Sequence, residues 1–424
     1  MKTTTLLLLL ITFCTVVVIG PRSFGNESEA RVLPFGTGTP GGRGGKILRV
    51  TNLESEGPGS LRAAVHAEGP RIIVFEVGGV IDVKKKHLVV SNPFVTIAGQ
   101  TAPFPGITII KGCMLVKTHD VILQHIAVRP GDAGEPKRSG WESDAISTFA
   151  HGEVEGGVYN IVIDHCSGTW ATDENMSVSG PRNARENQTS HDVTFSNCII
   201  AEGLQNSTHK KGRHSRGTLI MDGCSRIALI NNLFAHNNKR HPLFKGGSSG
   251  VVVNNLMVNP GRQCILMTES GHGKRLGEPI VSIVGNIMIP GKNTKTGFIE
   301  GPGKVYARDN AILKSGQEIV PVDDRGEERH LWPEGLKVLP AKEVREHVLT
   351  HAGMRPAERD SIDERIILQC REGRGRIIDS QNDVGGYPSY QMTRRTLRIP
   401  SKNVDAWLRE MAIEVEKGLD TQQQ

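Results

Sequence analysis

Aromatic residues are scarce in this sequence. Phe, Trp and Tyr together make up 4% of the 424 residues, whereas glycine is abundant with 49. Val, Ile and Asn recur together along the chain. Such a composition favours many short strands and tight turns over a helical core. The length exceeds that of a typical single domain, so we expect either two domains or one elongated repeat fold.

Long apolar runs are missing except near the amino terminus. Lys2 precedes an apolar run from Leu6 to Ile19, and small residues follow up to Gly25. The run is short for a bilayer span, and its order of charged, apolar and small residues is typical of a secretory signal peptide. We predict that residues 1–25 are a signal peptide. The mature protein is then secreted, extracellular or periplasmic, with no membrane attachment after cleavage.

Basic runs interleaved with aromatic residues are also missing, which argues against a nucleic-acid partner. The formal net charge is nevertheless +6, a mild excess that suits an acidic partner. Because export removes the chain from nucleic acid, an acidic polysaccharide is the favoured partner. We expect the protein to act as a monomer.

The cysteines lack the spacing of a metal site, since no C-x-x-C pair occurs. Cys14 falls in the expected signal peptide. The other six are Cys113, Cys166, Cys198, Cys224, Cys264 and Cys370. Two interpretations stay open, namely disulfide pairing in an exported protein and buried thiols stacked within a core.

An internal repeat is the clearest positive signal in the sequence. Seven segments begin with a polar or turn residue, continue with alternating β-formers and reach a His or Asn. These anchors are His125, His165, Asn197, Asn232, Asn255, Asn286 and Asn310. Their spacings are 40, 32, 35, 23, 31 and 24 residues, as expected for coils that share one body and differ in loop insertions. We expect the anchors to stack as a ladder at a bend, with Asn197, Asn232 and Asn255 facing inward.

The repeat predicts an all-β fold, a right-handed parallel β-helix (solenoid) over residues 30–320. A β-sandwich is disfavoured because hairpin turns would separate its strands at shorter, unrelated intervals. Charged helical periodicity appears after about residue 320. We therefore predict a C-terminal extension over residues 321–424 whose helices pack on the solenoid and cover its exposed end.

Acidic residues cluster on two neighbouring coils of the expected solenoid. Asp144 and Asp173 fall one coil apart, and stacked strands lie about 4.8 Å apart, so the two carboxylates can share one cation. Ca²⁺ suits such a site because it accepts several oxygen ligands in loose geometry. Further candidate ligands are Glu142, Glu174 and Ser177. A solvated loop is the alternative for any single carboxylate.

Basic residues follow on the next two coils. One run extends from His209 to His214 and contains Lys210 and Lys211, and the second extends from Asn238 to Lys245 and contains Arg240. Either run alone is typical of a solvated face. Beside a cation site, however, they concentrate the positive charge that a polyanion requires.

Several motifs in this sequence resemble those of polysaccharide lyase family 1, the pectate lyase and pectin lyase superfamily. The segment VIDHCSGTWATDENMSV is similar to the Asp-His strand and calcium ligand of that family, and RHPLFK from Arg240 is similar to its Arg-x-Pro-x-x-Arg segment. A bacterial secreted subgroup is the nearest match. Its motifs correspond here to IAGQTAP from Ile97, His-x-Lys-Gly from His209 and IIDSQNDVGGYP from Ile377.

The resemblance implies a pectate lyase that cleaves polygalacturonate-type acidic polysaccharide by calcium-assisted β-elimination. Arg240 occupies the place of the family's arginine base. Lys245 and Lys211, with Lys210 beside it, would bind substrate carboxylates. Ser177 stands where a further Asp ligand of calcium is expected, which lowers the number of anionic ligands.

Two other functions remain open. A β-helical glycoside hydrolase of the polygalacturonase kind needs paired carboxylates, which Asp144 and Asp173 could supply, but its further signatures are missing. A non-catalytic β-helix that binds glycan is the second alternative.

Overall fold

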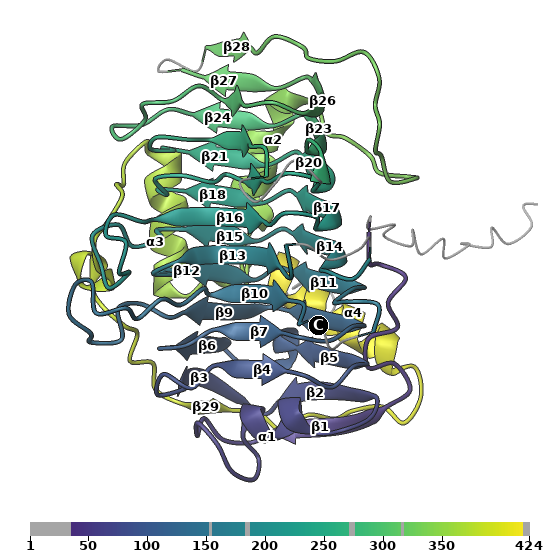
Figure 1. Ribbon diagram of the computed structural model, residues 1–424. Helices are drawn as coiled ribbons and strands as arrows, with labels where there is room; N and C mark the ends of the chain where they lie inside the picture. Colours follow the sequence, from purple (N-terminus) through teal and green to yellow (C-terminus); the bar gives the residue numbers. More distant parts are fainter. Residues whose placement is uncertain (1–34, 152–154, 183–186, 271–275, 315–317, 419–424) are drawn as a thin grey trace, which may run out of the picture. The chain divides into compact units, whose positions relative to one another are not determined.

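The computed structural model describes residues 35–151, 155–182, 187–270, 276–314 and 318–418. The expected signal peptide, residues 1–25, lies outside this range. From Lys46 onward the chain runs in turn through three parallel sheets, which form the faces of the stacked coils (Figure 1). We call them the first, second and third sheets. None of the helices in the described part of the chain has the length and apolarity needed to span a bilayer.

The three sheets share one order of strands. The first sheet contains β1 (Lys46–Val50), β2 (Arg71–Phe75), β5 (Val95–Ala98), β8 (Val121–Gln124), β11 (Ile161–Asp164), β14 (His191–Ser196), β17 (Ser225–Ile230), β20 (Ser249–Val253), β23 (Ile280–Val284) and β26 (Lys304–Arg308). The second contains β3 (Val77–Asp82), β6 (Ile107–Ile110), β9 (Ile126–Arg129), β12 (Ser167–Thr169), β15 (Ile199–Ala201), β18 (Leu233–Ala235), β21 (Leu256–Val258), β24 (Ile287–Ile289) and β27 (Ala311–Leu313), with β28 (Ile319–Pro321) and β29 (Thr393–Arg394) at its edges. The third contains β4 (Leu88–Val90), β7 (Met114–Val116), β10 (Ile146–Phe149), β13 (Glu174–Ser179), β16 (Arg216–Ile220), β19 (Leu243–Phe244), β22 (Ile265–Met267) and β25 (Ile299–Glu300).

All seven repeated segments form strands of the first sheet, each parallel to its neighbour. For example, Ile163 of β11 pairs with Phe195 of β14, which pairs with Leu229 of β17. Among the strands that the structure describes, β28 and β29 pair antiparallel, at the two edges of the second sheet. The prediction of a right-handed parallel β-helix is confirmed.

Apolar side chains from all three sheets fill the interior of the coils. Cys166 and Cys198, one coil apart, are fully buried there. All six cysteines after residue 100 are free thiols. Of the two interpretations left open by the sequence, buried thiols are therefore correct.

The Asn ladder forms, but its register differs from the prediction at Asn197. Asn232, Asn255, Asn286 and Asn310 are buried, and the side-chain oxygen of each accepts the backbone N–H of its counterpart on the preceding coil at 2.9–3.0 Å. Strand pairing places Cys198, not Asn197, beside Asn232.

Asn197 instead belongs to a neighbouring position on the bend, which it shares with His125, His165, Asn231 and Asn254. All five have φ between 48° and 56°, the left-handed conformation that Asn tolerates well. Asn197 is half-buried, and its amide donates to Asp164. Expecting it to face inward was therefore wrong by one residue.

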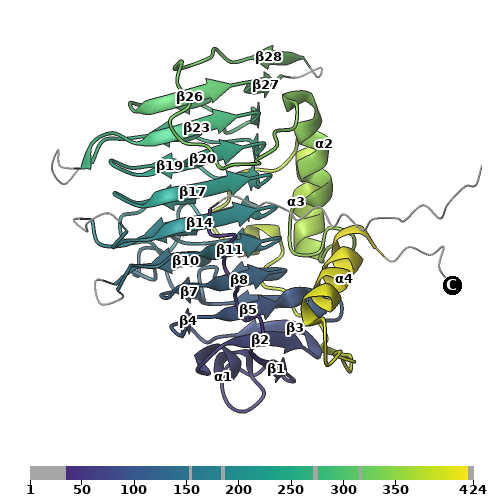
Figure 2. The ribbon, with the colours of Figure 1, turned by 90° about the vertical axis from the view of Figure 1, so that its right-hand side faces the viewer.

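Three C-terminal helices pack along the side of the stacked coils (Figure 2). Helices α2 (Ala341–His351) and α3 (Ser361–Arg371) bury apolar side chains against the outer face of the second sheet. Helix α4 (Val404–Lys417) contributes Leu408 to a cluster on the first sheet. No third-sheet residue belongs to either cluster, so these contacts leave the outer face of the third sheet open.

The ends of the stack are closed differently from the prediction. Helix α1 (Leu61–His66) caps the amino-terminal end and buries Leu61 and Val65 in the interior. At the other end β28 pairs with β27. The C-terminal helices therefore cover a side, and in the described residues they do not cover an end. Two short 3₁₀ helices, η1 (Gly99–Thr101) and η3 (Gln381–Val384), lie outside the sheets.

Candidate functional site

Three carboxylates meet where strands of the third sheet begin. Asp144 lies two residues before β10, Asp173 directly precedes β13, and Glu174 is its first residue. The pairing of Ile146 with Met176 brings Asp144 beside Glu174, whose backbone N–H donates to Asp144 Oδ1 at 2.9 Å. One oxygen from each carboxylate lies within 4.8 Å of the others. The sequence-based pair is thus brought together, with Glu174 as its third member.

Asp144 is held by hydroxyl groups of the third sheet. Ser177 Oγ donates to Asp144 Oδ2 at 2.6 Å and lies 2.6 Å from Ser147 Oγ. Burial, and after it the charge of Asp173, raises the pKa of Asp144 to about 7. A cation between the carboxylates would keep Asp144 ionised at neutral pH.

Two stacked histidines face Asp173. The rings of His209 and His214 are 3.5 Å apart between centroids and 14° from parallel. His214 Nε2 lies 2.8 Å from Asp173 Oδ1, and His209 Nε2 lies 3.7 Å from it. Burial would raise the pKa of Asp173, but the hydrogen bond from His214 and the neighbouring positive charges hold it below its usual value. Asp173 is therefore ionised and held in a fixed orientation.

Arg240 touches the carboxylate cluster directly. Its guanidinium forms an ion pair with Glu174, whose side chain is 5% exposed. Burial lowers the pKa of Arg240, although the charges of Asp173 and Asp144 oppose this. Its φ of 69° lies in the left-handed region, as does the φ of His125 and of His165 at other bends of the coils.

The other residues predicted from the sequence lie around this cluster. Glu142 Oε1 accepts the backbone N–H of Lys210 at 3.2 Å and lies 3.5 Å from His209 Nδ1, outside the three-carboxylate group. The Lys210 and Lys211 side chains are exposed. Lys211 donates its backbone N–H to His209 Nδ1 at 3.1 Å.

Lys245 has a different partner from Arg240. It directly follows β19, whereas Arg240 precedes that strand. Its ammonium nitrogen lies 3.0 Å from Asp222 Oδ2, and the Asp222 side chain is fully buried. Lys245 therefore compensates a buried charge, which the spacing of the motif does not reveal.

From the sequence alone, His214 and Lys239 fall in basic runs without a role for either, and Arg216, which also lies where the strands of the third sheet begin, is missed. Glu174 was considered only as a further ligand, and its pairing with Arg240 depends on a register that spans two coils. The backbones of Arg216 and Lys239 form an isolated parallel β-bridge, although 23 residues separate them in the sequence. Arg216 begins β16, and Lys239 precedes β19. The recurrence of a basic residue near the start of successive third-sheet strands is the signal that could have found them.

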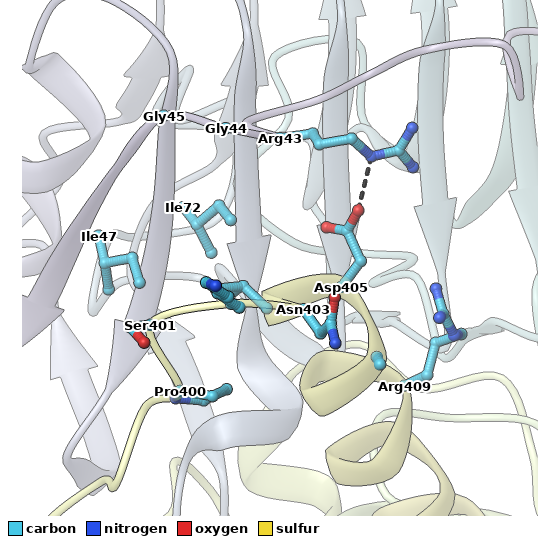
Figure 3. A pocket seen from close by; sticks show the side chains of 13 residues that line it. Arg43, Gly44, Gly45, Ile47, Ile72, Pro400, Ser401, Asn403, Asp405 and Arg409 are labelled. Carbon is cyan, nitrogen blue, oxygen red and sulfur yellow. Dashed lines mark ion pairs between the residues drawn. The ribbon is translucent and has the colours of Figure 1, made fainter.

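A separate pocket of about 790 Å³ lies between the first sheet and the start of α4. Figure 3 shows Arg43 and Asp405 facing each other across it, with an ion pair of 2.7 Å. Its lining includes none of the carboxylates described above. It is thus not part of the candidate site.

Comparisons with known proteins identify relatives of this chain. The protein named "Probable pectate lyase C" of Emericella nidulans is 33% identical over 370 residues, which cover 83% of this chain and 78% of that protein. The protein of the same name from Aspergillus terreus is 32% identical over 370 residues, which cover 83% and 79%.

This chain belongs to the pectate lyase family. The prediction of a polysaccharide lyase is thereby confirmed. The expected bacterial subgroup is not supported, since these pectate lyase relatives are fungal. No protein-family model matches the chain.

A solved structure independently supports the fold of this pectate lyase. The major cedar pollen allergen jun a 1 superimposes with a TM-score of 0.52 at 18% identity, and the match covers 77% of this chain and 96% of the allergen. At that identity the likeness bears on the fold alone.

Proposed function

We propose that this protein cleaves polygalacturonate-type acidic polysaccharide by β-elimination, with Ca²⁺ held by Asp144, Asp173 and Glu174 and with Arg240 as the base. The observation that carries the proposal is the contact between Arg240 and a cluster of three carboxylates. The substrate class is supported by the names of the relatives, which are pectate lyases. The apolar run from Leu6 to Ile19 further supports secretion, and we propose a monomer.

The residues present fit calcium. All donor atoms of the cluster are carboxylate oxygens, with the Ser177 hydroxyl beside them, and Ca²⁺ prefers oxygen ligands in loose geometry. Burial and the charge of Asp173 raise the pKa of Asp144, and a bound cation would favour its ionised form. When bound, calcium would pair with the C6 carboxylate of a uronate and make its C5 proton easier to lose.

Arg240 would take the C5 proton. The electron pair of the C5–H bond forms the C4–C5 double bond, the C4–O bond breaks, and the departing oxygen takes a proton from solvent. A guanidinium is normally charged, so its lowered pKa is required for this role. The ion pair with Glu174 fixes its position next to the cluster.

The remaining predicted residues would act around the three carboxylates and Arg240. Ser177 would orient Asp144 as a hydrogen-bond donor. Glu142 would hold the segment of Lys210 in place. The exposed Lys210 and Lys211, which follow His209 in the chain, and Lys245 would attract uronate carboxylates.

The test is incubation with polygalacturonate with and without a chelator, followed by ultraviolet absorbance and by a reducing-end assay. Elimination predicts new reducing ends together with a conjugated double bond, both lost with the chelator. Reducing ends without ultraviolet absorbance would show a hydrolase instead. Binding without either product would show a non-catalytic glycan-binding protein.

A further inference from the structure

A pair of buried histidines lies beneath the last turn of α4. His125 and His165 occupy the same position on neighbouring coils, at the bend between the first and second sheets. Their rings are stacked, with centroids 5.1 Å apart and planes 10° from parallel. Glu416, the penultimate residue of α4, is also buried, and its Oε1 lies 3.6 Å from His125 Nε2 and 3.6 Å from His165 Nδ1. Three side chains that can bind a metal therefore meet inside the protein.

The contacts of His125 leave one ring nitrogen with an available lone pair. Its Nδ1 lies 2.8 Å from the carbonyl oxygen of Met354, and because a carbonyl oxygen only accepts, Nδ1 carries the proton. In the neutral ring Nε2 is then an acceptor, but among the described residues no hydrogen-bond partner reaches it, although the side chain is 0% exposed. It faces the carboxylate of Glu416, which also only accepts. Two acceptors that face each other in a buried place require a cation between them, either a proton or a metal ion.

The distances around Glu416 suit a divalent transition metal. Ligand atoms about 2.0–2.2 Å from a tetrahedral zinc ion lie roughly 3.3–3.6 Å from one another. Both separations from Glu416 Oε1 are 3.6 Å, and one donor atom from each of the three side chains lies within 4.8 Å of the others. Two imidazoles and a carboxylate are a donor set that zinc uses in proteins, whereas calcium prefers oxygen ligands alone.

Neighbouring groups would complete and support such a site. Asp164 Oδ2 lies 3.0 Å from His165 Nδ1, which places it to be a fourth ligand. The other oxygen of Asp164 is held by Ser196 and Asn197, and the Met354 carbonyl orients the ring of His125, as groups behind a metal ligand commonly do. The C-terminal end of α4 also carries the negative end of the helix dipole. A proton can bridge only two of these ligands, whereas a metal ion engages all four, which favours the metal.

We propose that His125, His165 and Glu416 bind a Zn²⁺ ion that fastens α4 to two neighbouring coils. Asp164 supplies the fourth ligand. The site is separate from the carboxylate cluster beside Arg240, which lies where strands of the third sheet begin and offers only oxygen donors. Because the ligands come together only in the folded chain, the ion stabilises the fold and takes no part in cleavage.

The experiment measures Zn²⁺ binding to chelator-treated protein by calorimetric titration and by thermal unfolding. The parent protein carries Asp173→Asn, because Asp173 belongs to both other groups of possible metal ligands in the described residues. Glu416→Gln is added to remove one ligand while keeping its shape, and Glu410→Gln, exposed on the same helix, is the matched control. We expect one Zn²⁺ per chain in the parent and the control, with a melting temperature that rises with zinc concentration. Glu416→Gln should weaken zinc binding about tenfold or more and reduce that rise.

Absence of zinc binding in the parent, or equal affinity in the Glu416→Gln and Glu410→Gln proteins, would overturn the site. The cation between His125 and Glu416 would then be a proton. If Glu416→Gln folds poorly, a crystal of the zinc-loaded parent decides the matter through anomalous scattering at the zinc edge. A peak between α4 and the two histidines is expected, and a peak elsewhere or none would refute the proposal. None of these measurements uses turnover, so their outcome is independent of the proposed function.

Discussion

In two regions of this β-helix an arginine lies beside carboxylates. The opposite charges are paired in one region and separated in the other. On the second sheet, Arg129 pairs with Asp360 and Asp363 at the start of α3, and all three side chains are fully buried. On the third sheet, Arg240 contacts one of three clustered carboxylates, and Arg216 and Lys239 follow without an ion pair among the described residues. The buried ion pairs of Arg129, which we call the closed network, attach α3 to the coils. The separated charges where the third-sheet strands begin, which we call the open edge, instead require partners from solution.

Breaking the closed network should have the largest effect on stability. Burial alone would raise the pKa of Asp360, but Arg129 holds it below its usual value. Burial, and after it the charge of Asp360, raises the pKa of Asp363, and Arg129 opposes that rise. Arg129→Met should lower the free energy of unfolding by about 3–5 kcal/mol, because it leaves buried carboxylates without a partner. Urea unfolding measures this, with Arg398→Met as a control. A loss below about 1 kcal/mol would contradict the account.

Changing the open edge should affect turnover instead. Arg240→Lys keeps the positive charge but alters reach and pKa, so turnover should fall about a hundredfold or more with little change in KM. Steady-state kinetics at saturating calcium measures this. If only KM rises, Arg240 is a substrate clamp, and Lys211 becomes the next candidate for the base.

Lys245 combines features of both regions, because it pairs with buried Asp222 yet belongs to the same motif as Arg240. Lys245→Ala should raise KM several-fold, by about 1 kcal/mol of lost charge attraction, and lower turnover less. It should also reduce stability, since Asp222 loses its partner. Reduced stability with an unchanged KM would show that Lys245 is structural only.

The half-buried ion pair of Asp192 and Arg226 should have the smallest effect. Burial would raise the pKa of Asp192, but Arg226 lowers it to about 2. Because the folded pKa lies below the unfolded one, this pair stabilises the protein above about pH 4, and its contribution is lost as the pH falls toward 2. Asp192→Asn should cost about 1 kcal/mol or less at pH 7. A difference between wild type and Asp192→Asn that persists unchanged at pH 2 would contradict this origin.

The fold could be predicted from the sequence because each coil repeats one pattern of strand and bend. The register of Asn197 could not, since His125, His165 and Asn197 occupy one position of the bend and Asn232 the next. Both positions accept Asn for different reasons, one for its left-handed backbone and the other for its side-chain hydrogen bonds.

The site was predictable where a motif was contiguous, as at Asp144, Asp173 and Arg240. The alignment of Arg216 with Lys239 escaped prediction because parallel strands bring together residues separated by a full coil. Loop insertions vary the length of each coil, so the sequence alone does not fix which residues align across strands.

The central claim is that the carboxylate cluster beside Arg240 holds the calcium required for elimination. It is tested most directly by titrating activity on polygalacturonate with calcium for the wild type and for Asp173→Asn. Loss of this ligand should raise the calcium concentration for half-maximal activity about tenfold or more, as loss of a metal's supporting groups commonly does. Identical calcium titrations for the two proteins would contradict the account and remove Asp173 from the site.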